Sequence, residues 1–339
     1  MTLLVTGGTG FVMSVVTRTW LDMNPGARAV ILDRADLDAA AQKYLAPVSG
    51  RLTAVKADVL DHGTWEPSLE GLGITAVVHG ATITPISRGS AAEARREPEA
   101  EDPARIIDVN LMGTVRVLDW ARKQQGLKRF VYVSSGSVYR HHGPDWSGEP
   151  LPEDGYVAPL RLYGISKFAS EMIANRYRDL FGIPAVSVRL ASVYGTMDRA
   201  TESRNFRHVP NRIAHMALAG ETVRPTNTDA VGDYVHAEDV ARAIIALIEA
   251  PKLSYRTYNI GSGVITTIAD FISYATEKVP ALKWELAPLE TCNVDQNPNL
   301  STGMWGVYDI ARIITDTGWR PRNVREAFHG YMDWIATSG

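Results

Sequence analysis

Cysteine is almost absent from this chain of 339 residues, and Cys292 is its only thiol. A single cysteine excludes a disulfide within the chain and a metal cluster built on thiolates. Long apolar runs are missing too, since stretches such as residues 74–81 and 243–248 fall far short of the ~20 residues that span a membrane. The chain opens directly into Leu-Leu-Val at residues 3–5, without a signal-peptide core. We therefore expect a reduced, soluble, cytoplasmic protein.

A surplus of charge of one sign is also missing. The 35 Lys and Arg residues nearly balance the 38 Asp and Glu residues, so the formal net charge is −3. Without a basic field, the chain has little electrostatic attraction for nucleic acid or for an anionic membrane. We therefore expect a small-molecule substrate and neither of these two partners.

Short β-branched runs alternate with longer helical stretches over the first two thirds of the chain. Predicted strands cover residues 2–5, 29–32, 52–56, 76–79, 129–134 and 185–190, and predicted helices cover 11–24, 37–45, 64–69, 106–125 and 160–181. This alternation is typical of βαβ units, and continuous apolar strands suit a sheet that is covered on both faces. The pattern predicts an α/β fold with a doubly wound, mostly parallel sheet.

The chain changes character after about residue 190, where Pro, Asn and Thr become more frequent. Helices are predicted at 210–220 and 237–250, a polar loop at 293–302, and two more helices within 308–337. The mixed charge run at 88–105 predicts a solvated loop or short helix, with a partner-binding insert as the alternative.

A glycine-rich segment, Thr-Gly-Gly-Thr-Gly-Phe at residues 6–11, joins the first predicted strand to the first predicted helix. Gly7 permits a tight turn, Gly10 lets the backbone approach a pyrophosphate, and the helix N-terminus offers free N–H groups to phosphates. A bare turn also favours glycine, so the position between strand and helix carries the argument. We predict a dinucleotide site that includes Gly7, Gly10, Phe11 and Val12.

Acidic residues at later strand ends indicate which dinucleotide binds. Asp33 ends the second predicted strand, where a carboxylate can hold the adenosine ribose diol and repel a 2′-phosphate; this favours NAD over NADP. Arg34 keeps NADP open, because a guanidinium can accept that phosphate. Asp58 has two interpretations, a contact to adenine or a helix N-cap. The expected cofactor site also includes three residues that follow the third and fourth strands: Val59, Gly80 and Ala81.

One position departs from the dinucleotide-binding pattern. Its third glycine would fall at residue 13, where this chain has Met13. That glycine normally lets the helix pack tightly on the strand. We expect the Met13 side chain either to point elsewhere or to push the helix away from the sheet.

Small hydroxyls close the fifth predicted strand, and a tyrosine and a lysine follow on a helix. Tyr163 and Lys167 are four residues apart and share one helix face, so the ammonium can lie near the phenol. A nearby positive charge favours the phenolate, which makes Tyr163 usable as a general acid or base. Lys167 can also bind the nicotinamide ribose, and Ser135 can hold the substrate oxygen. The spacing alone occurs by chance in many helices; its order after the glycine loop and Asp33 favours a catalytic site.

Four further motifs complete a family resemblance. They are Asn-Leu-Met-Gly-Thr at 110–114, Arg-Leu-Ala-Ser-Val-Tyr-Gly at 189–195, Asp-Tyr-Val-His-Ala-Glu-Asp-Val-Ala at 233–241, and Gly-Trp-Arg-Pro at 318–321. Over nearly its whole length the chain resembles the extended short-chain dehydrogenase/reductases, the family of NAD-dependent nucleotide-sugar epimerases, dehydratases and sugar-acid dehydrogenases. The resemblance implies that Ser135, Tyr163 and Lys167 are catalytic and that Asn110 supports them.

The resemblance also implies a Rossmann-type NAD-binding domain with a smaller C-terminal substrate-binding lobe. The first comprises residues 1–190 with a return segment at about 233–260, and the second comprises 191–232 and 261–339. Homodimers are expected through the helices around 106–125 and 160–181. Leu111, Val115 and Leu118 suit that role, and they suit packing on the chain's own sheet equally.

Departures from the family pattern bear on the substrate. Nucleotide-sugar members usually carry an Asn where this chain has Ser192 and an Arg where it has Gly232, and residues 286–298 contain no basic residue. A buried diphosphate without these partners would be poorly compensated. The dehydratases have an Asp-Glu pair where this chain has Gly136-Ser137. We therefore expect neither a nucleotide-sugar substrate nor dehydration.

Cations near the expected pocket suit a carboxylate, as in the uronate- and aldonate-oxidising members; the alternative is that they face water. The predicted substrate-binding set is Ser135, Gly136, Ser192, Arg199, Arg204 and His141. The histidines lack Cys or carboxylate partners at ligand spacing, so no metal is expected.

Three functions remain open from the sequence. The first is an NAD-dependent oxidoreductase that interconverts a secondary hydroxyl and a ketone on a small polar, sugar-like substrate, with or without a carboxylate. The second is a sugar or nucleotide-sugar epimerase that retains NAD and uses the same residues. The third is a non-catalytic dinucleotide sensor.

Overall fold

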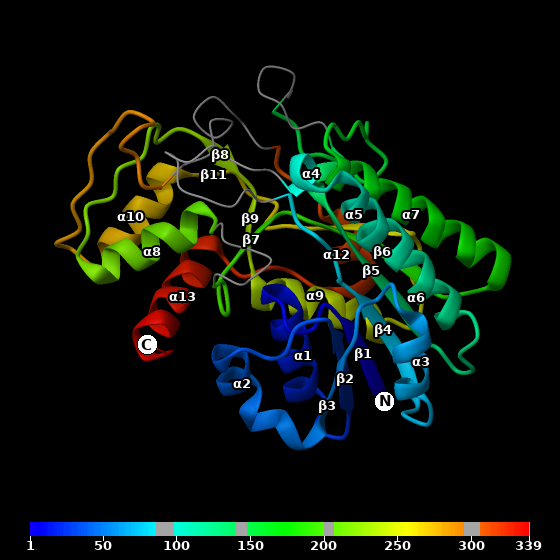
Figure 1. The fold of residues 1–339 in the computed structure, drawn as a ribbon. Coiled ribbons are helices and arrows are strands. Elements are labelled where there is room, and N and C mark those ends of the chain that lie inside the picture. Colours follow the sequence, from blue (N-terminus) through cyan, green and yellow to red (C-terminus); the bar gives the residue numbers. More distant parts are fainter. Residues whose placement is uncertain (86–97, 140–147, 200–206, 295–305, 339) are drawn as a thin grey trace.

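A parallel sheet of seven strands forms the centre of the computed structural model (Figure 1), which describes residues 1–85, 98–139, 148–199, 207–294 and 306–338. The strands are β1 (Thr2–Thr6), β2 (Arg28–Asp33), β3 (Leu52–Lys56), β4 (Ile74–His79), β5 (Arg129–Ser135), β6 (Ala185–Leu190) and β10 (Thr257–Ile260). Their order is β10-β6-β5-β4-β1-β2-β3, and every neighbouring pair is parallel. The order reverses between β1 and β4, which is the switch point where doubly wound sheets bind ligands.

Helices cover both faces of this sheet, as the apolar strands predict. The helices in the described ranges are α1 (Phe11–Met23), α2 (Ala39–Leu45), α3 (His62–Leu69), α4 (Pro98–Glu101), α5 (Pro103–Ile107), α6 (Gly113–Ala121), α7 (Leu162–Phe181), α8 (Val209–Ala219), α9 (Ala237–Glu249), α10 (Ile268–Lys278), α12 (Ala311–Thr317) and α13 (Val324–Ser338). Leu3 and Val5 of β1 pack in a core with α1 and α9, whereas Leu4 packs in the core of α3, α6 and α7. This alternation buries both sides of each central strand.

A second apolar core lies beyond the edge of the sheet, where α8, α10 and α13 pack together (Figure 1). Its centre is a group of rings that meet mostly edge to face: Tyr194, Phe271, Phe328 and Tyr331. Two short ribbons flank it. β7 (Ser192–Tyr194) pairs in parallel with β9 (Tyr234–His236), and β8 (Val231–Gly232) pairs antiparallel to β11 (Thr266–Thr267).

The predicted helix at 106–125 is interrupted. The chain runs from α5 through a π-helical turn, η2 (Asp108–Met112), into α6. Two hydroxyls bond to the carbonyl of Asn110, from Thr114 at 2.7 Å and from Ser170 of α7 at 3.1 Å. π turns of this kind are frequent at functional sites. Leu118 is fully buried in the core beneath α6, so for this residue packing on its own sheet is the correct interpretation.

Two 3-10 turns complete the described structure, η1 (Ala46–Arg51) and η3 (Gly136–Val138). No helix in the described part of the chain is both long and apolar enough to cross a bilayer. Most of the polar loop expected at 293–302 and most of the charge run at 88–105 lie outside the described residues.

Candidate active site

The glycine loop between β1 and α1 leaves no room for side chains at two positions. Gly7 has a φ of +71°, and a Cβ there would lie 2.9 Å from the Cα of Ala81. A Cβ on Gly8 would lie 2.5 Å from that of Ile31. Gly10 is the N-cap of α1 and makes no side-chain hydrogen bond to the helix. Gly10 therefore places no side chain of its own over the start of α1, where a helix N-terminus favours phosphate binding.

Met13 occupies space that Gly80 leaves free. The Met13 side chain is buried, and a Cβ on Gly80 would lie 2.3 Å from its sulfur. Of the two outcomes expected for Met13, the structure therefore shows the first: the side chain points over the end of β4. A glycine at residue 80 thus makes the room that a glycine at residue 13 makes in the usual pattern.

Asp33 supports the glycine loop from the end of β2. One of its carboxylate oxygens accepts hydrogen bonds from the Thr9 amide at 3.1 Å and the Thr9 hydroxyl at 2.7 Å, and the other accepts from the Ala35 amide at 3.1 Å. A carboxylate has about four lone-pair positions, so it retains capacity for a ribose diol. Arg34 beside it is exposed. The Asp33 carboxylate thus suits the ribose diol of a dinucleotide. The exposed Arg34 guanidinium beside it keeps a 2′-phosphate open as the alternative.

Asp58 is not the helix N-cap, and that interpretation is wrong. Helix α3 begins at His62 with Asp61 as its N-cap residue. Asp58 accepts a hydrogen bond from the Leu60 amide at 3.0 Å and forms an ion pair with Arg105 at 2.6 Å. These bonds outweigh its partial burial and lower its pKa. Val59 is buried, and its side chain contacts the position of Gly113.

Three successive residues of β5 contact side chains on one face of α7, and we call this set of contacts the clasp. Lys167 donates a hydrogen bond to the Val133 carbonyl at 2.8 Å, and Ser134 donates one to Glu171 at 2.5 Å. The Tyr163 phenol interacts with the Ser135 hydroxyl. A Cβ on Gly164 would lie 2.5 Å from the Ser137 carbonyl, so glycine lets α7 approach this strand end closely. The structure therefore brings Ser135, Tyr163 and Lys167 together.

Burial controls the ionisation of these groups. It raises the pKa of Tyr163, which the hydrogen bond to Ser135 lowers only in part. It lowers the pKa of Lys167 to about 7, against the opposing attraction of Glu171. Lys167 Nζ lies 5.7 Å from the centre of the Tyr163 ring. Desolvation therefore sets the direction of the Tyr163 pKa shift, and the expected lowering by Lys167 is not observed.

Asn110 ties the π turn to the site. Its amide oxygen accepts from the Ile83 amide at 2.8 Å, and its amide nitrogen donates to the Ile83 carbonyl at 3.1 Å and to Ser166 at 3.2 Å. Ser166 lies between Tyr163 and Lys167 on α7. Asn110 therefore supports the helix that carries both residues and does not contact their side chains in these bonds.

His79 ends the buried strand β4, as its surroundings in the sequence indicate. Its ring nitrogens are bonded to Thr6 at 2.6 Å and Thr114 at 3.0 Å. Burial, with the charge of Lys167, lowers the pKa of His79 to about 3. The ring is neutral and links β1 to α6.

A buried ion pair beneath the site was not anticipated from the sequence. Arg189 of β6 binds Glu171 through two nitrogens, the shorter contact being 2.8 Å, and donates to the Glu153 carbonyl at 2.9 Å. The spacing of Glu171, four residues after Lys167 and eight after Tyr163, places it on the same helix face. That spacing is the signal that could have identified it.

Tyr308 is a second residue that the sequence did not reveal. A Cβ on Gly136 would lie 1.3 Å from the Tyr308 hydroxyl, so the phenol occupies the space that a side chain at 136 would fill. Asp233 fixes Tyr308 by accepting its backbone N–H at 3.1 Å, together with those of Ser262 at 2.6 Å and Gly263 at 3.2 Å. The phenol of Tyr308, from a distant part of the chain, thus lies against Gly136 at the end of β5.

The predicted substrate residues have different locations. Ser192 lies in β7, paired with β9, and is partly exposed. Arg204 and His141 lie outside the described residues. Arg199 is placed differently from its expected role, since its guanidinium binds Asp38 at 2.8 Å and the Thr9 carbonyl at 3.2 Å. These partners belong to the glycine-loop end of the sheet, and β2 and β5 are three strand spacings, about 14 Å, apart.

Metal-binding side chains are not grouped in the described ranges, where no three His, Cys, Asp or Glu residues are arranged to hold an ion.

Comparison with known proteins identifies the family. The model of the NAD dependent epimerase/dehydratase family matches residues 3–261, and the chain belongs to this family. The cofactor that defines the family is the one predicted from the glycine loop and Asp33.

Relatives include a UDP-glucose 4-epimerase of Mycolicibacterium smegmatis, 29% identical over 266 residues and 78% of each chain. A dTDP-glucose 4,6-dehydratase of Salmonella typhimurium is 25% identical over 96% of this chain and 90% of its own. Among solved structures, a UDP-glucose 4-epimerase of Thermus thermophilus in complex with NAD has a TM-score of 0.76 and 25% identity, with 100% of both chains covered.

Proposed function

We propose that this chain is an NAD-dependent enzyme that interconverts a secondary hydroxyl and a ketone on a small, sugar-like substrate. The observation that carries the proposal is the clasp between β5 and α7, which assembles Ser135, Tyr163 and Lys167 at the carboxyl end of a central strand. In doubly wound sheets this is the edge where ligands bind.

The cofactor site of this proposal uses the loop after β1 and the end of β2. Gly7, Gly10, Phe11 and Val12 would surround the diphosphate, and Asp33 would hold the adenosine ribose. When bound, NAD supplies a hydride acceptor that is restored by the substrate itself in an epimerase and leaves reduced in a dehydrogenase.

The chain's own residues handle the proton and the oxygen. The Ser135 hydroxyl donates a hydrogen bond to the substrate oxygen, and the Tyr163 phenolate oxygen takes the hydroxyl proton. Lys167, with a pKa of about 7, is charged in part at neutral pH and stabilises that phenolate. Since Tyr163 is buried and its pKa is raised, the proton transfer depends on this positive charge and on the bond to Ser135.

One feature supports a substrate without a diphosphate, and another bears on a substrate carboxylate. Gly232 stands where the family's arginine would be, and a Cβ there would lie 2.9 Å from the Tyr234 ring. Arg199, engaged by Asp38 and Thr9, is withdrawn from the carboxylate-binding role. A carboxylate on the substrate would therefore depend on Arg204 and His141.

Epimerisation is the second candidate function, and the relatives favour it. The first three relatives are UDP-glucose 4-epimerases at 26–29% identity. The same serine, tyrosine and lysine would serve, and a nucleotide sugar would be the substrate. We also propose a cytoplasmic homodimer for either activity.

The decisive experiment follows nicotinamide absorbance with NAD or NADP and a panel of aldonates, uronates, free sugars and UDP-glucose. Tyr163→Phe should lower turnover by about 10²-fold or more, because it removes the proton acceptor. Tyr177→Phe is the matched control on the same helix and should retain turnover. Net NADH formation identifies a dehydrogenase. Bound NAD released only on denaturation, with conversion of UDP-glucose and no net reduction, identifies an epimerase; neither result would refute catalysis by this site.

A further inference from the structure

The segment that follows β7, residues 195–199, crosses from the second core to the glycine loop; we call it the strap. It begins at Gly195, with a φ of +119°, where a Cβ would lie 2.4 Å from the His236 ring. Met197 is buried and has a φ of +68°, the one positive φ among the described residues that are not glycine. Backbone strain of this kind persists where surrounding contacts enforce it. The strap is therefore a constrained segment of the chain.

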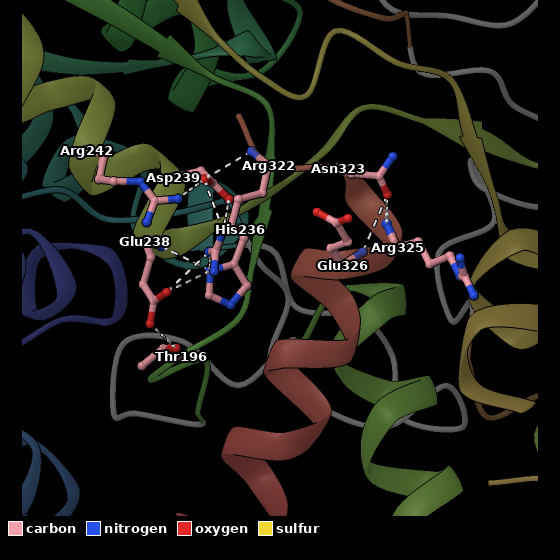
Figure 2. Close-up of polar contacts among 9 residues, drawn as sticks. All are labelled: Thr196, His236, Glu238, Asp239, Arg242, Arg322, Asn323, Arg325 and Glu326. Atoms are coloured by element: carbon pink, nitrogen blue, oxygen red, sulfur yellow. Dashed lines mark hydrogen bonds and ion pairs between the residues drawn. The ribbon is translucent and has the colours of Figure 1, made fainter. Parts of the chain in front are cut away.

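Buried and half-buried polar contacts fix the near end of the strap (Figure 2). Thr196 donates a hydrogen bond to Glu238 at 3.0 Å, and Glu238 pairs with Arg322 at 3.2 Å. Arg322 also binds the buried Asp239, at 3.1 Å, and His236 Nδ1, at 2.7 Å. Burial, then the charges of Arg322 and Arg242, lower the pKa of His236 well below its usual value, so its ring is neutral. This network leaves Thr196 little freedom to move.

Arg199 forms the far end of the strap. Its guanidinium donates to Asp38 at 2.8 Å, to the Thr9 carbonyl at 3.2 Å and to the Met197 carbonyl at 3.3 Å. The Thr9 amide and hydroxyl are bonded to Asp33. Thr9 is therefore held by Asp33 on one side and Arg199 on the other, directly before the N-cap residue of α1.

We propose that Arg199 is a positioning residue for the dinucleotide: by holding the Thr9 carbonyl it fixes the glycine loop and slows the release of bound NAD. The proposal rests on the NAD-binding role of this loop under Proposed function. A loop fixed before binding loses less conformational entropy when the ligand arrives, so affinity increases. The reach of Arg199 from the strap also couples the second core to the cofactor site.

The test measures the dissociation rate of NADH by its fluorescence, together with the thermal midpoint of each variant. Arg199→Ala should raise the dissociation rate about 10-fold, the range expected for losing hydrogen bonds from a charged donor. Arg224→Ala is the control, because Arg224 makes an ion pair of the same length with Glu285, 2.8 Å, that is more exposed and lies beside the second core. It should leave the dissociation rate within about twofold of the parent's, the factor corresponding to a small surface-pair contribution.

Two further variants separate positioning from folding. Arg199→Lys keeps a charge for Asp38 without the planar fork, so its rate should lie between those of the parent and the alanine variant. Asp38→Asn retains an acceptor for the Ala41 amide that Asp38 now caps, and should raise the rate less than Arg199→Ala. Equal NADH dissociation from the parent, Arg199→Ala and Arg199→Lys proteins overturns the inference alone. A parent protein that binds no NADH overturns the proposed function itself.

Discussion

Lys167 is a buried ammonium group whose ionisation affects the stability of the folded chain. Its pKa is about 7 in the folded protein because of burial, whereas an unfolded chain holds this proton up to about pH 10.4. Between these values the unfolded state binds more protons, so folding becomes more favourable as the pH rises. A Lys167→Met variant lacks this dependence. The unfolding free energy of Lys167→Met minus that of the parent should fall by about 3 kcal/mol from about pH 7 to about pH 9.5, because only the parent gains stability over this range.

Urea unfolding of both proteins over this pH range measures the effect. Lys278→Met is the control, because Lys278 makes a more exposed pair with Asp333 at 2.7 Å. Its difference from the parent should change little with pH. If the Lys167→Met difference is as constant as that of the control, Lys167 titrates near its ordinary pKa and is not tuned by burial.

The contact between helix α1 and the end of strand β4 depends on a large side chain, Met13, that lies against a glycine, Gly80. Gly80→Ala would place a methyl group 2.3 Å from the Met13 sulfur. Both groups are in a packed interior, so we expect a loss of about 1–3 kcal/mol of stability from overpacking. In a Met13→Ala background the same substitution at 80 should cost much less, because the sulfur is gone. Urea unfolding of the two single variants and the double variant gives this coupling directly.

Gly26→Ala serves as the control for this pair, since a Cβ there meets nothing within 4 Å. It should shift stability by less than about 0.5 kcal/mol. If the effects of the substitutions at 13 and 80 are additive, the Met13 side chain does not need the space beside Gly80. Another feature must then explain how α1 packs without the third glycine of the loop.

Most elements of the central sheet could be predicted from sequence because each is a continuous β-branched run. Two predicted strands, 52–56 and 185–190, have the observed bounds, and the other four are short by one or two residues. Strand β10 was not predicted as a strand. It has four residues, including the polar Asn259, and its extended conformation depends on pairing with β6.

The candidate site also contains residues whose positions could not be predicted from the local sequence. Ser135, Tyr163 and Lys167 are recognisable because local spacing places the last two on one helix face. Tyr308 is not, since its position over Gly136 depends on Asp233 and on the path of the chain between them. The contacts of Arg199 could not be predicted for the same reason: its partners, Asp38 and Thr9, are remote in sequence. Contacts fixed by local periodicity were predictable, and contacts fixed by tertiary packing were not.

On the scale of the whole molecule, we propose the outer face of α7 as the surface that pairs with a second copy of the chain. Ile165 and Met172 are exposed there, seven residues apart, and Met112 of the neighbouring π turn is exposed as well. Tyr163 and Lys167 lie on the opposite, buried face of the same helix. Pairing through α7 would therefore support the helix that carries the proposed catalytic side chains, Tyr163 and Lys167.

This arrangement predicts that the parent protein has twice the mass of one chain in light scattering after gel filtration. Met172→Glu should shift the mass to that of a single chain, because a charge would be buried at the centre of the interface without a partner. Leu218→Glu is the control, since Leu218 is exposed on α8 in the second core and should leave the mass unchanged. A parent of single-chain mass would contradict the dimer. If instead Met172→Glu separates the copies and also lowers turnover, while Leu218→Glu does neither, the pairing of α7 is what keeps Tyr163 and Lys167 in register with β5.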